Sequence, residues 1–372
     1  MKKPQIQRFV QYLLAGPVVG FFLSCSFLTL ATAGEDLHYI YTIDNSTADN
    51  RVLVLEQKPD GSLVTIRSLS THGVGTGAGL GSQGALAVSN GGRWLFAVSA
   101  GSNQITTFAV DDGNLRFVST TSSGGIFPIS LTSHGNLVYV LNAGGAGNIT
   151  GFEIQRNGSL EPIADSTQDL GGGSTGPAEI KFSNGGDFLI VSEKNVNLLA
   201  VYEVEDGVAH APTFTSSSGP VPFGFDIDPR DHVIVSEAAN GTVSSYDLRD
   251  RTHDLSVITG SLQTEQKAPC WLIVTPNGRY AYTGNTASGT VTGFSVARNG
   301  VLTRLVASGV NASTGAGSHL IDVAASADGR FLYALANISQ TISAFRIAAD
   351  GSLTPSGIIS GVPTSTSGLI AR

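Results

Sequence analysis

Charged residues and cysteine are both scarce in this chain of 372 residues. Asp, Glu, Lys and Arg together make up 13% of it, and Cys occurs only at Cys25 and Cys270. The 21 basic residues are outnumbered by 29 acidic ones, so the formal net charge is -8. A nucleic-acid or anionic-membrane binder needs a face rich in Lys and Arg. We therefore predict no nucleic acid as a partner, and the scarcity of Lys and Glu runs also excludes a coiled coil or helical bundle.

Long apolar runs are absent except near the start of the chain, where residues 13–30 are almost uncharged. Basic residues precede this run and small residues follow it, at Lys2, Lys3, Arg8 and Ala31-Thr32-Ala33. This pattern is typical of a secretory signal peptide. We expect a signal peptide over 1–33 and an exported chain, periplasmic or secreted, over 34–372. Lipid attachment at Cys25 and an uncleaved membrane anchor remain alternatives; no other contact with a membrane is expected.

Disulfide and metal signals are missing as well. After removal of residues 1–33 only Cys270 would remain, so no disulfide can form within the chain, and we expect a buried, small apolar side chain there. The seven His residues are scattered singly, without a His-x-His or His-x-x-x-His pair. The G-x-G-x-x-G match over 79–84 leads into a strand rather than a helix, which argues against a dinucleotide site. We predict neither a metal nor a cofactor.

The chain is rich in Gly, with 46 residues, and contains a repeated unit. One copy has a short strand at 86–89, a Gly-Gly-Arg turn, a second strand at 94–98 and a third at 105–110. An Asp-Gly-Asn turn then leads into a fourth strand at 115–120. Such turns need positive φ, which glycine adopts without a Cβ clash. The unit therefore predicts four antiparallel strands.

Six complete copies and one partial copy are visible. The first turn recurs at Gly92, Gly135, Gly186, Asp231, Gly278 and Gly329, and the third strand repeatedly carries an aromatic residue, at Phe152, Tyr202, Tyr246, Phe294 and Phe345. The partial copy, over 39–69, lacks an innermost strand, and 367–371 resembles the missing piece. We predict an all-β fold, a seven-bladed β-propeller of four-stranded antiparallel blades closed by the C-terminal strand in the first blade.

The long, variable loops of such a ring share one face, where binding residues usually lie. Aligning the ends of the second strands gives a ring of positions at Asp44, Ser99, Asn142, Glu193, Glu237, Asn285 and Ala336. Aligning the starts of the innermost strands gives a second set at Gln83, Pro128, Glu179, Phe223, Trp271 and His319. These two sets are the candidates for the mouth of the central channel.

From them we predict three catalytic residues, Glu193, His319 and Glu237. The expected substrate-binding residues are Asn142, Lys194, Asn285, Trp271, Gln83 and Asp44. Glu193 is the preferred base, with His319 as an alternative base or proton donor. Structural alternatives stay open: a Glu at a strand end can pair with a backbone amide or with Lys194, His319 can bond its own loop, and Trp271 can pack between blades.

Two turn sequences, over 275–282 and 326–333, and the Gly-Ser-Leu hairpins at Gly61, Gly158 and Gly351 resemble those of a known family. It is the seven-bladed lactonase family of 6-phosphogluconolactonase and carboxymuconate-cyclising enzymes. The resemblance implies chemistry on lactones or muconates through His, Arg and Glu residues that face the channel, and Glu193 and His319 resemble two of these. The sequence departs from the family in having X-Pro pairs before several innermost strands and no evident Arg facing the channel.

We therefore interpret the chain as an exported lactonase-like protein that hydrolyses or forms a small lactone at the channel mouth, with a lactone or organic acid as its partner. The alternative is a non-catalytic extracytoplasmic propeller that binds a small ligand or an unidentified protein.

Overall fold

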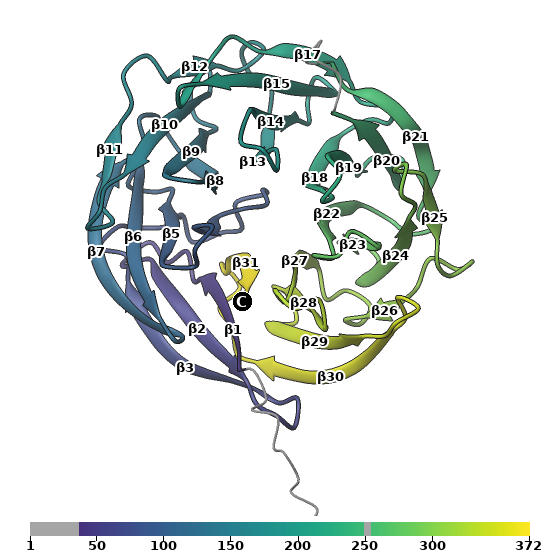
Figure 1. Cartoon of the computed structure of the whole chain (residues 1–372). Coiled ribbons are helices and arrows are strands. Elements are labelled where there is room, and N and C mark those ends of the chain that lie inside the picture. Colours follow the sequence, from purple (N-terminus) through teal and green to yellow (C-terminus); the bar gives the residue numbers. More distant parts are fainter. Residues whose placement is uncertain (1–36, 249–253) are drawn as a thin grey trace, which may run out of the picture. The chain divides into compact units, whose positions relative to one another are not determined.

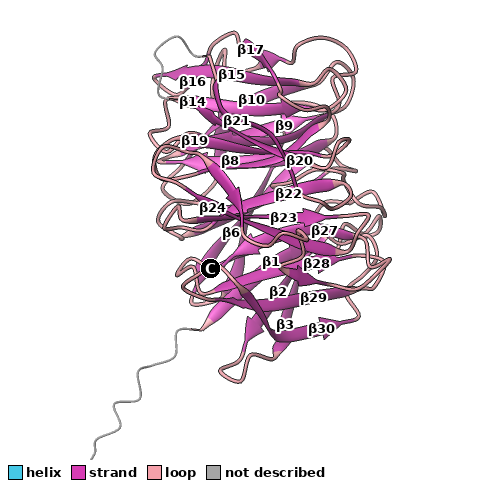
Figure 2. Cartoon of the chain, turned by 90° about the vertical axis from the view of Figure 1, so that its right-hand side faces the viewer, coloured by secondary structure: helices cyan, strands magenta, loops and turns pink. Residues whose placement is uncertain are grey.

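The computed structural model describes residues 37–248 and 254–372, which belong to one compact unit, Leu37–Arg372. Seven sheets form a ring in this unit (Figure 1), and the prediction of a seven-bladed propeller is confirmed. The side view shows the sheets stacked around the ring, with strands and loops alone (Figure 2). The predicted signal peptide over 1–33 lies outside the described residues.

Each blade orders its strands from the centre outwards, and several blades add a short outer strand. The first three blades are β31 (Ser367–Ala371), β1 (His38–Ile43), β2 (Arg51–Gln57) and β3 (Leu63–Ser70); β4 (Leu86–Val88), β5 (Trp94–Ser99), β6 (Gln104–Asp111) and β7 (Asn114–Ser122); and β8 (Pro128–His134), β9 (Leu137–Asn142), β10 (Asn148–Ile154), β11 (Leu160–Pro162) and β12 (Gln168–Asp169).

The remaining four blades follow the same order. They are β13 (Pro177–Phe182), β14 (Phe188–Glu193), β15 (Leu198–Glu205), β16 (Val208–Ala209) and β17 (Thr213–Ser216); β18 (Pro222–Ile227), β19 (His232–Glu237), β20 (Thr242–Asp247) and β21 (Ser256–Gln263); β22 (Pro269–Val274), β23 (Tyr280–Asn285), β24 (Thr290–Val296), β25 (Leu302–Arg304) and β26 (Ala312–Ser313); and β27 (Leu320–Ala325), β28 (Phe331–Ala336), β29 (Thr341–Ile347) and β30 (Leu353–Ser360).

The ring closes through the C-terminal strand, as the sequence predicts. Strand β31 pairs antiparallel with β1, with Tyr41 opposite Ile370. The backbone N–H of Arg372 donates to the carbonyl of Tyr39 over 2.8 Å, and a 3.1 Å bond returns from Tyr39 to Arg372. The first blade is thus built from both ends of the described chain and has the four-stranded order of the other blades.

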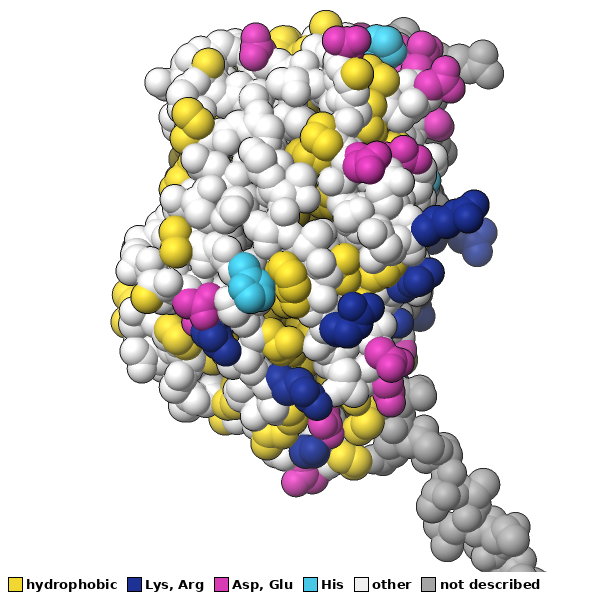
Figure 3. All heavy atoms as spheres, turned by 90° about the vertical axis from the view of Figure 1, so that its left-hand side faces the viewer, with side chains coloured by type: hydrophobic (Ala, Val, Ile, Leu, Met, Phe, Trp, Pro, Cys, Tyr) yellow, Lys and Arg dark blue, Asp and Glu magenta, His cyan; other side chains and the backbone are white. Residues whose placement is uncertain are grey.

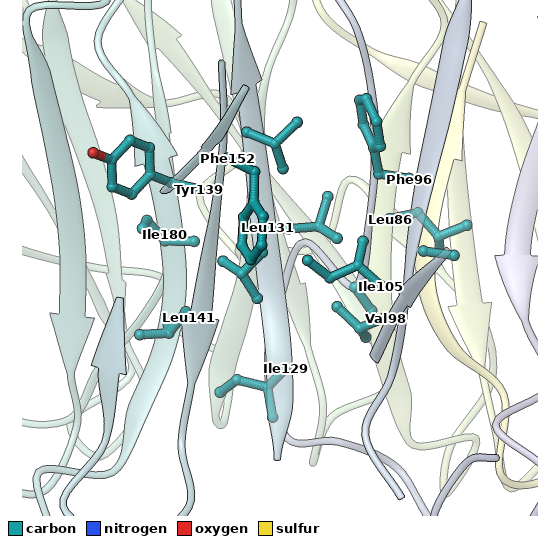
Figure 4. Close-up of a cluster of buried hydrophobic side chains, with 14 of the residues drawn as sticks. Leu86, Phe96, Val98, Ile105, Ile129, Leu131, Tyr139, Leu141, Phe152 and Ile180 are labelled. Atoms are coloured by element: carbon teal, nitrogen blue, oxygen red, sulfur yellow. The ribbon is translucent and has the colours of Figure 1, made fainter. Parts of the chain in front are cut away.

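The core lies between neighbouring blades. The aromatic residues of the third strands, which identify the repeat, are almost fully buried; they are Phe108, Phe152, Tyr202, Tyr246, Phe294 and Phe345. In Figure 4, Phe152 and Leu131 of one blade lie between Ile180 of the next blade and Ile105 of the preceding one. Burial of each such side chain stabilises the fold by about 1.5–3 kcal/mol, and only neighbouring blades can supply it.

The connection between β3 and β4 reaches into the middle of the ring (Figure 1). Its last part, residues 79–84, is called the central loop here. Three inner strands of other blades hold this loop: Ser82 Oγ donates to the carbonyl of Ile129, the Gln83 N–H donates to that of Ala178, and the Gln83 side chain bonds both backbone groups of Leu272. The Gly-rich segment that resembles a dinucleotide motif therefore lies in the centre of the propeller, held by the innermost strands.

The surface reflects the low charge of the chain. Uncharged polar and hydrophobic groups cover most of the face drawn in Figure 3, and its charged side chains gather mainly toward one edge. Within residues 37–248 and 254–372, no helix is long and apolar enough to cross a membrane.

Candidate active site beside the central loop

A repeated joint holds the start of each innermost strand in five blades. The residue before the strand has a left-handed backbone, with φ of 62° at Phe127, 61° at Gly176, 62° at Val221, 54° at Ala268 and 57° at His319. The carbonyl of that residue accepts the N–H of the residue that follows the second strand, namely Ala143, Lys194, Ala238, Thr286 or Asn337. The unusual backbone at His319 is therefore a property of the fold, whereas the side chains at the joint differ from blade to blade.

In the seventh blade this joint carries a paired histidine and amide. Nδ1 of His319 lies 2.7 Å from Oδ1 of Asn337, and Nδ2 of Asn337 donates to the carbonyl of Thr364 over 3.2 Å. Because the Asn337 Nδ2 is the donor to Thr364, its Oδ1 must accept from His319. The imidazole then carries its proton on Nδ1 and a free lone pair on Nε2, so Asn337 presents His319 as a base.

A cavity of about 220 Å³ opens at this pair. We call it the His319 cavity. Its walls come from the central loop, the inner ends of β22, β27 and β31, and the loop after β28; the residues are Gly79, Leu80, Gly81, Ser82, Trp271, His319, Ile321, Asn337, Ser367 and Gly368. A Cβ added at Gly79 or Gly81 would meet nothing within 4 Å, so the space beside the loop is open.

Two predicted residues, His319 and Trp271, thus line the same cavity. Trp271 is 5% exposed, and its Nε1 lies 3.4 Å from the carbonyl of Ser82. Its ring is tilted against that of Phe223, with 5.1 Å between centroids. The predicted contact of Trp271 with a ligand is compatible with this position, and its packing role is evident.

Lys194 lies over the Phe223 ring of this aromatic pair. Its Nζ is 4.5 Å from the centroid of Phe223 and donates to the carbonyl of Gly81 over 2.8 Å. Burial lowers the pKa of Lys194 to about 8. Lys194, in the fourth blade, and Gln83, in the central loop itself, hold this loop in place by hydrogen bonds. Both predicted binding residues therefore shape the cavity but do not line it.

The predicted base Glu193 lies elsewhere. It is fully buried at the end of β14, and its Oε1 accepts the N–H of Gly171, in the connection from the preceding blade, over 3.1 Å. Its Oε2 has no hydrogen-bond partner among the described residues. Burial raises the pKa of Glu193, although the bond from Gly171 opposes this. Glu193 does not line the His319 cavity, and the structure does not bring it together with His319.

Glu237 holds the corresponding position in the fifth blade and is saturated with hydrogen bonds. Its carboxylate accepts from the N–H of Gly219 over 2.7 Å and from the hydroxyls of Thr242 and Ser244 over 2.6 and 2.7 Å. Two longer bonds come from Ser217 and Ser261. All five donors fix strands or loops around β19, so this carboxylate has a structural function.

The remaining predicted residues at the ends of the second strands are engaged in the same way. Asn142 donates to the carbonyl of Ser123, Asn285 bonds Thr290 and Thr292, and the carboxylate of Asp44 accepts the N–H of Arg51. Asn142 and Asn285 are fully buried and Asp44 is 9% exposed. Successive side chains along a strand point to opposite sides. In the fourth and seventh blades the residue after the second strand, Lys194 or Asn337, therefore takes part in the central site, and the last residue of the strand does not.

The predicted alignment of the innermost strands is wrong in register. The equivalent first residues of the innermost strands are those that pair with the last residue of the second strand: Pro128 with Asn142, Pro269 with Asn285 and Leu320 with Ala336. In each of these three blades a bulge follows directly after this pair. His319 therefore precedes its strand, whereas Trp271 lies two residues inside β22. The extra residue of a bulge leaves no mark in the apolar pattern of a short strand.

Sequence reasoning missed Asn337 because the alignment stopped at Ala336. The signal was present in the repeat, since Lys194 and Asn337 both follow directly after a second strand. Of a group of charged residues on the innermost strands, sequence reasoning selected Glu179 as a candidate for the channel mouth but missed Lys181 and Asp226. Glu179 accepts the N–H of Phe225, Asp226 accepts that of Val274, and Lys181 pairs with Asp226 over 2.5 Å. These carboxylates bind amide groups on the inner edge of the next blade.

The charged group borders a second cavity of about 240 Å³, lined mainly by the innermost strands and including Glu179 and Lys181. Burial raises the pKa of Glu179 and of Asp322 well above the usual range. Among the described residues, no three His, Cys, Asp or Glu side chains are grouped so that they could hold a metal ion.

Comparison with known proteins agrees with this architecture. The profile of the family "Lactonase, 7-bladed beta-propeller" matches residues 33–172, 146–238 and 240–362, and the chain belongs to this family. A Staphylococcus aureus protein of uncharacterized function is 23% identical over 175 residues, which are 45% of this chain and 51% of that protein. The chain thus spans about half the length of the curated relatives that it matches.

Solved structures share the fold along nearly their whole length. A periplasmic gluconolactonase of Pseudomonas aeruginosa superposes with a TM-score of 0.68 at 16% identity, covering 90% of this chain and 99% of that one. A candidate 6-phosphogluconolactonase of Bacteroides fragilis gives a TM-score of 0.69 at 19% identity, with 92% and 99% covered. At these identities the likeness concerns the fold.

Proposed function

We propose that this protein hydrolyses a small lactone in the His319 cavity, with His319 as the general base. The observation that carries the proposal is the His319–Asn337 pair, because it fixes the imidazole with a free Nε2 in the wall of a small cavity. Membership of the lactonase family supports the reaction type. The cavity lies below the roughly 300 Å³ at which sites for drug-sized ligands begin, which favours a small substrate.

The reaction would proceed by attack of water. Nε2 of His319 takes one proton from the water while its oxygen bonds to the lactone carbonyl carbon, and the carbonyl oxygen becomes an oxyanion. The backbone N–H groups of Gly79 and Gly81, which have no acceptor within the described residues, are the proposed donors to this oxyanion. The ring C–O bond then breaks, and the imidazolium returns its proton to the leaving alkoxide. The product is the open hydroxy acid.

The proposal moves the base from Glu193 to His319. Glu193 remains a predicted catalytic residue that hydrolysis assays can test, but its burial and its bond to Gly171 favour a structural role. The same holds for Glu237, whose five donors leave little capacity to accept a proton from water.

A non-catalytic binding protein is the second candidate. It is favoured by one observation: apart from His319, no acidic or basic side chain of the described residues lines the His319 cavity, so only one side chain there is suited to proton transfer. In that case the cavity would bind a small ligand without turning it over.

A pair of glycine variants separates these functions and locates the site. Neither Gly79 nor Gly91 has a positive φ, and a Cβ at either position would meet nothing within 4 Å. Gly79 lines the cavity, whereas Gly91 lies in the turn between β4 and β5. We expect Gly79→Leu to reduce lactone hydrolysis at least tenfold and Gly91→Leu to leave it unchanged. Binding without hydrolysis, lost only in Gly79→Leu, would support the binding protein; equal activity of both variants would exclude this cavity.

We also propose that the protein is exported, by cleavage after Ala33. The support is the sequence pattern of residues 1–33, together with a periplasmic gluconolactonase among the structural neighbours. The intact mass of the protein recovered from outside the cytoplasm is expected to correspond to residues 34–372. A chain that retains residues 1–33, or one lipidated at Cys25, would contradict this.

A further inference from the structure

The His319 cavity is poorly suited to a charged ligand. Within the described residues, its lining includes no Asp, Glu, Lys or Arg. Lys194, the cation fastened to the central loop, already donates to the Gly81 carbonyl and lies over Phe223. A phosphate or carboxylate in the cavity would lose its water without gaining a counter-ion, which is unfavourable.

The cavity is equally unsuited to a ligand with many hydroxyl groups. Its polar side chains, His319 apart, are already bonded within the protein: Ser82 Oγ to the carbonyl of Ile129, Asn337 to Thr364 and His319, and Ser367 Oγ to Ser365 and Leu80. The groups left for a ligand are Nε2 of His319, which has no hydrogen bond within the described residues, and the second N–H of the Asn337 amide. A polyhydroxylated ring would leave most of its hydroxyls without a partner, and such unpaired groups oppose binding strongly.

Apolar side chains supply the remaining contacts. Leu80, Trp271 and Ile321 line the cavity and are themselves 8%, 5% and 8% exposed. Ile338 follows the lining residue Asn337 in the loop after β28, and its hydrophobic side chain is 64% exposed. Apolar surface therefore lies inside the cavity, and an exposed apolar side chain follows one residue after its lining.

From this arrangement we infer that the substrate is a neutral lactone with an apolar substituent, rather than a sugar lactone or a phosphorylated one. Its ring carbonyl would lie at His319 and the backbone N–H groups of the central loop. Its hydrocarbon part would contact Trp271, Leu80 and Ile321 and extend toward Ile338. This inference rests on the proposed lactonase function for the catalytic step, but the class of ligand follows from the lining alone.

The test compares four δ-lactones that share a six-membered ring: δ-valerolactone, δ-octanolactone, glucono-δ-lactone and its 6-phosphate. We expect kcat/KM for δ-octanolactone to exceed that for either sugar lactone at least tenfold. Ile338→Ser should lower kcat/KM for δ-octanolactone severalfold and leave that for δ-valerolactone unchanged. Ile358→Ser, in the outer strand β30 and 60% exposed in the native chain, is the matched control and should change neither.

Binding of the corresponding δ-lactams, which resist hydrolysis, separates this inference from the proposed function. If the propyl-substituted lactam binds and gluconolactam does not, the ligand class is supported even when no lactone is hydrolysed, and only the proposed function fails. If glucono-δ-lactone is hydrolysed as well as δ-octanolactone or better, with activity sensitive to Gly79→Leu, the function stands and this inference is overturned. Absence of both binding and hydrolysis would overturn both.

Discussion

Nδ1 of His319 lies 2.7 Å from Oδ1 of Asn337, across a backbone joint that five of the seven blades share. In the other four of these blades the joint connects Phe127 to Ala143, Gly176 to Lys194, Val221 to Ala238 and Ala268 to Thr286. The same backbone geometry thus occurs in several blades. Only in the seventh blade do the side chains at this joint include a base, His319, and a residue that orients it, Asn337.

Asn337 is expected to act as a positioning residue. Asn337→Ala should lower kcat about tenfold or more with little change in KM, because the His319 ring would lose its fixed orientation. Asn337→Asp should retain activity but move the acid limb of the pH–rate profile to higher pH, since a neighbouring carboxylate favours protonated imidazole. An unshifted profile in Asn337→Asp would mean that the pair does not control the base.

Glu193 and Glu237 hold equivalent positions but should respond oppositely to amidation. Burial raises the pKa of Glu193, so its stabilising contribution is present at low pH and is lost as the pH rises through the folded-state pKa. Glu193→Gln should therefore melt no lower than the native chain at pH 7. Glu237→Gln places an amide NH₂ among five donors and should cost about 1–3 kcal/mol. Denaturant titrations of both variants at pH 7 and pH 5 test this; equal losses would contradict it.

Lys194 should impose a pH dependence on stability. Burial lowers its folded-state pKa to about 8, whereas the unfolded chain holds the proton up to about 10.4. Between these values the unfolded state binds more protons, so this group makes stability rise with pH. Lys194→Met removes that contribution, and the difference in unfolding free energy between native chain and variant should change between pH 8 and pH 10. A difference independent of pH would refute the burial of the ammonium.

Removal of β31 should destabilise the propeller far more than loss of a frayed end. Deleting residues 367–372 exposes β1 and the apolar contacts of Leu369, and we expect the melting temperature to fall by about 10 °C or more. Arg372→Ala is the control: it removes the guanidinium bond to the carbonyl of Gly92 but retains the strand, and should cost only a few degrees. Matching melting temperatures for the deletion and the native chain would show that this strand does not close the ring.

The repeat made the fold predictable, because each blade depends on its neighbours for burial and an aromatic residue, Phe or Tyr, returns in most third strands. Closure by β31 followed from the missing inner strand of the first copy. The site was less accessible. The sequence predicts His319 and Trp271, and both line one cavity. Asn337 was missed by one residue, because the alignment of the second strands stopped at Ala336. A bulge at the start of the inner strands also misaligned those strands, because it changes the register without changing the apolar pattern. The central loop could not be placed either, because its partners at Ala178, Lys194 and Leu272 are distant in the sequence.

The role of His319 as the base is tested by kcat/KM for δ-lactone hydrolysis by the native chain and by His319→Gln. His210→Gln serves as control, since His210 is 52% exposed at its side chain and lies beside Glu205, outside the cavity. We predict a loss of about 10²-fold or more in His319→Gln at an unchanged melting temperature, and no loss in His210→Gln. Hydrolysis by His319→Gln at the native rate would contradict the account.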